Sequence, residues 1–122
     1  TKIKLPTKPF KKDFDSNIFI GINLVQVCFT INKVTFHFDD DLHVTTETEF
    51  VFTLNGKRHS SVPENVSIEC LSLLETPVTS ALVVDQGTLE LRFGESMALI
   101  FLDTSENYES YSITNSGVTT IV

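Results

Sequence analysis

Three consecutive aspartates stand between two histidines in the segment VTFHFDDDLHV, residues 34–44. Imidazole and carboxylate groups are ligands of zinc and other transition metals, so His37, His43 and one aspartate suggest a metal site. Zinc usually takes three or four protein ligands, however, and acids at the tip of a turn point towards water. Three adjacent acids also lack the alternate spacing and the glycine of a calcium-binding EF-hand loop. We therefore expect no metal at this segment.

Signatures of catalysis are absent from the sequence. His59 lies next to Ser60, but neighbouring residues of a strand point to opposite faces of a sheet, so this spacing pairs no nucleophile with a base. The chain contains no G-x-S-x-G motif, no glycine-rich phosphate loop and no Cys–His motif. We therefore expect a protein that is not an enzyme and that needs no cofactor.

Acidic residues supply the strongest chemical signal. The chain carries 16 acidic and nine basic residues, a net charge of −7, and five of the nine basic residues lie in the first twelve positions. This balance disfavours nucleic-acid binding, which needs a basic surface to neutralise phosphates. It suits both solubility and the capture of a cationic protein.

The acids nearest to the predicted turns are the expected partner-binding residues. We expect the acids of residues 39–41 to form one anionic patch with the acids of the strand that follows. A second group follows the corresponding strand of the C-terminal half. The full set is Asp39, Asp40, Asp41, Glu47, Glu49, Asp103, Glu106 and Glu109.

Length and composition indicate one domain over residues 1–122. The chain is 41% hydrophobic and long enough to bury a core without disulfides or metal. No apolar run approaches the roughly 20 residues that span a bilayer, and the N-terminal lysines precede no signal peptide. Cys28 and Cys70 match no metal or redox spacing, which is typical of reduced thiols. These features predict a cytoplasmic protein without membrane contact.

Short segments rich in Val, Ile, Thr and Phe, separated by turn residues, predict β-strands. Asn55 and Gly56 are a strong hairpin signal because both accept the positive φ of a type I′ turn. The expected strands are residues 22–30, 33–38, 42–48, 50–55, 56–61, 78–84, 88–93, 96–102, 108–114 and 117–122. This pattern predicts a mainly β fold, with antiparallel sheets that form a sandwich or a partly open barrel.

One short helix is expected over residues 62–75. Residues 61–64 have the S-x-x-E form of a capping box, and Pro63 suits the first turn of a helix. The apolar side chains that share one helical face are Val66, Cys70, Leu73 and Leu74. The chain then divides into an irregular Lys-rich arm (1–17), a first β unit with its hairpin (18–61), the helix (62–75) and a second β unit (76–122).

The two β units repeat each other at a spacing of 55 residues. The matching apolar positions are Val34, Phe36, Phe38, Leu42 and Val44 in the first unit and Leu89, Leu91, Phe93, Met97 and Leu99 in the second. Two related three-stranded meanders, joined by a hairpin and a helix, are the simplest interpretation.

The repeat also predicts the register of the strands. Phe38 and Leu42 must face the same core, which requires a three-residue turn at residues 39–41. That register places His37 opposite His43 on the outer face. In the second unit, residues 97–102 are apolar on both faces, which predicts a central strand.

The segment VTSALVVDQGTLELRFGE, followed after LIFLDTSEN by YESYSITNSG, resembles a family of short, uncharacterised bacterial β-proteins. The resemblance covers residues 19–122. In that family a strand–turn–strand unit occurs twice around a short helix and ends in a Tyr-Glu-x-Trp strand, where this chain has Tyr111 in place of Trp. The resemblance implies a repeated β fold and no particular activity.

Size, acidity, reduced cysteines and missing catalytic motifs are also similar to those of immunity proteins of bacterial contact-dependent growth inhibition and related polymorphic toxin systems. That resemblance implies a non-catalytic protein that binds one basic toxin domain, often a nuclease, through an acidic face, and that is a monomer or weak homodimer when free. Two alternatives stay open: a self-associating accessory β domain that uses the outer face of residues 97–102, and a small metal-binding protein or enzyme centred on His37 and His43.

Overall fold

The computed structural model describes residues 15–63, 66, 68–84, 87–102 and 111–122 of the 122-residue chain. These residues form ten β-strands and two short 3-10 helices. The strands are β1 (Leu24–Phe29), β2 (Val34–Phe38), β3 (Leu42–Thr46), β4 (Phe50–Leu54), β5 (Lys57–Ser61), β6 (Ser80–Val84), β7 (Thr88–Arg92), β8 (Met97–Phe101), β9 (Tyr111–Asn115) and β10 (Val118–Ile121). The 3-10 helices are η1 (Ser16–Phe19) and η2 (Ile68–Leu73).

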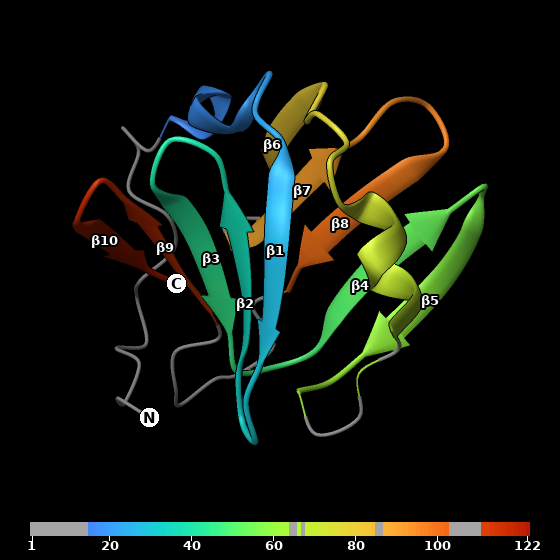
Figure 1. The fold of residues 1–122 in the computed structure, drawn as a ribbon, viewed down its shortest axis with the longest axis horizontal. Coiled ribbons are helices and arrows are strands. Elements are labelled where there is room, and N and C mark those ends of the chain that lie inside the picture. Colours follow the sequence, from blue (N-terminus) through green and yellow to red (C-terminus); the bar gives the residue numbers. More distant parts are fainter. Residues whose placement is uncertain (1–14, 64–65, 67, 85–86, 103–110) are drawn as a thin grey trace.

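Two antiparallel sheets of five strands pack against each other through one buried core (Figure 1). The first sheet has the order β1-β2-β3-β9-β10, and the second has the order β5-β4-β8-β7-β6. The described strands of one sheet do not pair with those of the other, so the sheets are not closed into a barrel. The predicted mainly β, antiparallel class is confirmed, in its sandwich form.

Each half of the chain gives its last hairpin to the sheet of the other half. The hairpin β4–β5 follows β1–β2–β3 in sequence but pairs with β8, whereas β9–β10 follows β8 and pairs with β3. The two junctions have the same register, because Phe50 faces Phe101 and Tyr111 faces Thr46, which lies 55 residues before Phe101. The predicted repeat of three strands is therefore a repeat of five, and neither half completes its sheet alone.

The register predicted for the first unit is confirmed. Phe38 pairs with Leu42 and His37 pairs with His43, so residues 39–41 form the three-residue turn. The pleat then places Phe38 and Leu42 in the core, where they are 4% and 2% exposed. Both histidines lie on the outer face of the sheet.

The register of the second unit follows the same rule. Leu91 pairs with Leu99, and the N–H of Phe93 donates to the carbonyl of Met97 at 2.9 Å. Ala98 and Leu99 point to opposite faces of β8 and are both buried. β8 lies at the centre of the second sheet, as its apolar faces predicted.

The helix expected over residues 62–75 is replaced by the shorter and tighter η2. A 3-10 helix has three residues per turn, so Cys70 and Leu73 lie on one face, and both are completely buried. The N–H of Thr76 donates to the carbonyl of Leu73, and Glu75 turns left-handed with φ 60°, which ends the helical geometry. Among the described residues, no helix has the length and hydrophobicity needed to cross a membrane.

The expected N-terminal arm is only partly described. Residues 1–14 lie outside the described residues. The end of the arm is regular, because η1 begins at Ser16 and its N-terminus is capped by Asp15, whose carboxylate accepts from the N–H of Asn17 at 3.0 Å.

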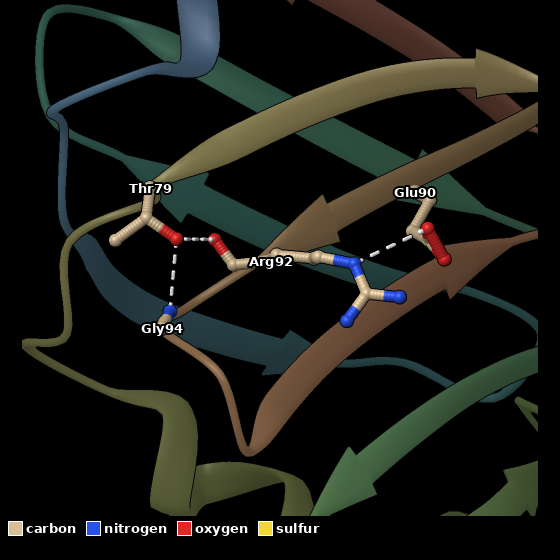
Figure 2. A network of polar contacts seen from close by, with 4 residues as sticks. All are labelled: Thr79, Glu90, Arg92 and Gly94. Carbon is tan, nitrogen blue, oxygen red and sulfur yellow. Dashed lines mark hydrogen bonds and ion pairs between the residues drawn. The ribbon is translucent and has the colours of Figure 1, made fainter.

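A polar network fixes the turn between β7 and β8 (Figure 2). The N–H of Gly94 donates to Thr79 Oγ1 at 2.9 Å, and this hydroxyl donates to the carbonyl of Arg92 at 3.2 Å. Gly94 has φ 86°, a left-handed conformation that glycine adopts without strain. The Arg92 side chain turns away from this network towards Glu90, with 3.5 Å between Nε and the carboxylate.

Phe36 joins the two sheets at the centre of the core. It comes from β2 and is completely buried, with its ring edge-on to Phe50 of β4 and Phe101 of β8, each at 5.3 Å between ring centres. Edge-to-face pairs of this kind add about 0.5–1.5 kcal/mol to the free energy gained from burial.

Replacing Phe36 with alanine therefore tests the inter-sheet core. We expect the free energy of unfolding to fall by about 3–5 kcal/mol in chemical denaturation followed by circular dichroism. Phe29→Ala is the matched control, because this phenylalanine of the edge strand β1 is 45% exposed and its truncation should cost about 1 kcal/mol or less. Equal losses in the two variants would contradict the described core.

Candidate functional site

The acidic turn, defined as residues 39–41, caps the hairpin of β2 and β3. Asp40 and Asp41 have φ values of 62° and 58°, in the left-handed region that Asp and Asn tolerate better than other non-glycine residues. Asp39 has a different role, because its N–H donates to the carbonyl of Asn23 and its carboxylate accepts from the N–H of Asn23 at 3.2 Å. This reciprocal pair holds the chain as it enters β1, so the Asp39 carboxylate is already in structural use.

Asp40 and Asp41 present their carboxylates to solvent. Both are exposed, and within the described part of the chain neither side chain forms a hydrogen bond or an ion pair. Their backbone is nevertheless fixed, because the carbonyl of Asp41 accepts from the N–H of Ser116 at 2.9 Å in the turn between β9 and β10. Two carboxylates without a partner are thus held on a rigid hairpin tip.

Glu47 and Glu49 do not join the acidic turn, contrary to the single patch expected from the sequence. They follow β3, which leads away from the turn, and an extended chain from Asp41 to Glu47 covers about 20 Å. Figure 1 shows the acidic turn at the upper end of β3 and the exit towards β4 at its lower end. Glu49 also accepts a hydrogen bond from the Ser60 hydroxyl.

The second group of expected binding residues, Asp103, Glu106 and Glu109, lies outside the described residues. The last described residue before it is Leu102, whose carbonyl accepts from Thr48 Oγ1 at 3.4 Å. The chain therefore leaves the described region beside the segment that carries Glu47 and Glu49.

The outer face of β8 offers less apolar surface than self-association through this face requires. Ala98 is 5% exposed, and Val51 of the neighbouring β4 is 1% exposed. Ile100 is only partly exposed. The large apolar side chain exposed on this outer face is Leu82 of the edge strand β6, at 55%.

His37 and His43 face each other across the outer face of the first sheet. Their ring centres are 5.2 Å apart, and the ring planes are tilted by 45°. Partial burial and the neighbouring His43 lower the pKa of His37. The same row continues with Gln26 opposite His37 on β1 and Thr114 opposite His43 on β9. Among the described residues, no third histidine, cysteine or acid joins the pair to form a three-ligand cluster.

His59 is a packing residue. Its ring stacks on Phe52 at 4.8 Å, and its Nε2 lies 3.7 Å from the Glu69 carboxylate of η2. This contact links β5 to η2. The Ser60 hydroxyl lies on the other face, where it donates to Glu49, so the structure pairs no serine nucleophile with His59.

Burial suppresses the reactivity of two further groups. Burial raises the pKa of the Cys70 thiol to about 11, so the thiolate nucleophile is scarce at neutral pH. Burial also raises the pKa of Tyr111, whose hydroxyl donates to the carbonyl of Gly87 at 2.8 Å. This bond connects β9 of the first sheet with the segment before β7 of the second, so the Tyr111 hydroxyl serves the fold.

Conformation and charge are separable at the acidic turn. Asn tolerates the left-handed backbone as Asp does, so Asp40→Asn with Asp41→Asn should leave the free energy of unfolding within about 0.5 kcal/mol of the parent. Alanine at both positions should cost about 1 kcal/mol for each, because its Cβ disfavours this backbone without a compensating side-chain hydrogen bond. Urea denaturation measures both variants. An equal loss with asparagine and alanine would contradict the assigned conformation.

The lowered pKa of His37 predicts a stability change on the acid side of neutrality. Between the ordinary histidine pKa of about 6.5 and the lower pKa of the folded state, the unfolded chain binds more protons than the folded protein. Stability should therefore fall as the pH drops through 6.5 and should recover as the pH rises. His37→Gln should remove this component from the unfolding free energy measured between pH 7.5 and 5. An unchanged profile in the variant would show that His37 does not contribute.

The comparison with known proteins gives a family but no activity. No curated protein and no solved structure matches this chain. One family model matches residues 18–122, which include both β units and both exchanged hairpins. The chain belongs to the family of unknown function DUF6188.

Proposed function

We propose that this protein is a non-catalytic immunity protein that binds and neutralises a basic toxin domain in the bacterial cytoplasm. The observation that carries the proposal is the pair of exposed carboxylates at Asp40 and Asp41. A rigid hairpin holds both, so little conformational entropy is lost when a partner binds them. The resemblance to immunity proteins in size, acidity and missing catalytic motifs supplies the kind of partner.

The charge of the acidic turn exceeds what the fold requires. The corresponding turn of the second unit is Gly94, Glu95 and Ser96, which has the same length and one acid. The left-handed backbone of Asp40 and Asp41 would be satisfied equally by asparagine or glycine, which carry no charge. A cationic partner accounts for the two carboxylates, whereas turn geometry alone does not.

Binding would follow from the chemistry of a toxin that acts on nucleic acid. Such a domain needs Lys and Arg side chains to hold phosphates, and a protein of net charge −7 attracts that surface over long range. Asp40 and Asp41 would pair with these cations and occupy the surface that otherwise contacts phosphate. Loss of a buried, hydrogen-bonded charge partner costs about 2–5 kcal/mol, whereas loss of an acid at the rim mainly slows association.

The position of the other acids limits the contact. Glu47 and Glu49 lie at the far end of β3, so they reach the same partner only if it spans the length of that strand. A small partner that sits on the acidic turn would also meet the β9–β10 turn, since Ser116 is bonded to Asp41. We therefore place Asp40 and Asp41 first among the binding residues.

A charge-matched pair of variants tests the proposal. The partner is the C-terminal domain of the secreted protein encoded directly upstream, and the readouts are growth protection on co-expression and the association rate in surface plasmon resonance. Asp40→Asn with Asp41→Asn should slow association at least about tenfold at low salt, with a smaller difference at high salt. Glu75→Gln with Glu95→Gln removes the same charge from two other exposed positions and should change the rate little.

Two results would contradict the proposal at different levels. Full protection and unchanged association by the Asp40/Asp41 variant would remove the acidic turn from the mechanism. Failure of the unaltered protein to protect against the toxin domain, or to bind it, would overturn the immunity function itself.

A further inference from the structure

The outer face of the first sheet carries an imidazole pair that the fold does not need. The internal repeat supplies the comparison: the positions 55 residues after His37 and His43 are Arg92 and Ala98, which pair across β7 and β8 in the same register. The second sheet therefore forms around this position without histidine. Both histidines are also partly exposed, so neither is a core side chain.

The geometry of the pair suits chelation. Directly opposed residues of neighbouring antiparallel strands have Cβ atoms about 4.5–5.5 Å apart, a separation that two side chains can bridge through one ion. Two imidazole nitrogens at about 2.1 Å from one zinc ion, with a tetrahedral angle between the bonds, place the ring centres about 5 Å apart. The ring centres of His37 and His43 are 5.2 Å apart, with the planes tilted by 45°.

We propose that His37 and His43 form a two-histidine binding site for one divalent transition-metal ion, of the class Zn²⁺, Ni²⁺ or Cu²⁺. The sequence argued against a metal because a third ligand was missing, and no third ligand joins the pair among the described residues. Two ligands are nevertheless enough for chelation when the strands hold them opposite each other. The site goes beyond the proposed toxin binding and does not depend on it.

The chemistry of the pair defines which ions bind and what remains open. Imidazole nitrogen selects borderline metals, whereas Mg²⁺ and Ca²⁺ prefer oxygen ligands. The protein supplies two of the four tetrahedral positions, so water, an anion or a side chain of a bound partner takes the others. The neighbours in the row, Gln26 and Thr114, are uncharged and leave room for such an exogenous ligand.

The site can be tested by isothermal titration of the full, tag-free protein with Zn²⁺ and Ni²⁺ alone. We expect saturable binding of one ion for each chain, weaker at pH 6 than at pH 7.5 because protons compete for the same nitrogens. His37→Gln and His43→Gln should each weaken binding at least about tenfold, since a single imidazole cannot chelate. Mg²⁺ and Ca²⁺ should give no signal.

His59→Gln is the matched control, because it removes the other histidine of the chain and leaves the pair intact. Circular dichroism of each variant confirms that it is folded, and exposure of the paired histidines makes their replacement compatible with folding. Binding that persists in the His37 and His43 variants, or that is lost in the His59 variant, would overturn the site. So would the absence of saturable binding at millimolar Zn²⁺ and Ni²⁺ by the unaltered protein.

Discussion

The packing of Phe36 against Phe50 and Phe101 is the contact on which the rest of the structure depends. Phe36 belongs to the first sheet, and its two partners belong to the second, where Phe50 arrives from the first half of the chain through the exchanged hairpin. The cluster therefore joins the sheets and the halves at once. With the inner faces fixed by this core, the period of two along each strand assigns every other side chain to the outer face, including both histidines of the pair.

The local features of this fold could be predicted because they follow from short-range alternation. The three-residue turn at residues 39–41, the His37–His43 pairing and the central place of β8 all follow from which residues must face the core. The exchange of hairpins could not be predicted in this way, because β4 and β9 satisfy the same pattern beside either meander. Only the three-dimensional packing of Phe50 and Tyr111 selects the partner strand.

Two further differences have specific physical causes. The spacing of Cys70 and Leu73 fits an α-helix and a 3-10 helix equally well, since residues three apart lie on one face of both, so the apolar pattern could not distinguish them. The single acidic patch failed because closeness in sequence was taken for closeness in space. An extended strand moves the chain by more than 3 Å for each residue, and β3 carries Glu47 to the other end of the sheet.

The candidate sites share one principle: the backbone of a repeat can be compared with itself to separate what the fold needs from what it does not. Asp39 bonds to Asn23 and is structural, whereas Asp40 and Asp41 supply charge that the turn of the second unit lacks. The central claim is that a basic partner contacts this turn, and amide chemical shifts recorded as the upstream-encoded toxin domain is added test it most directly. The account predicts the largest shifts at Asp40, Asp41 and the adjoining Ser116; largest shifts at Glu47 and Glu49, or on the outer face of β8, would contradict it.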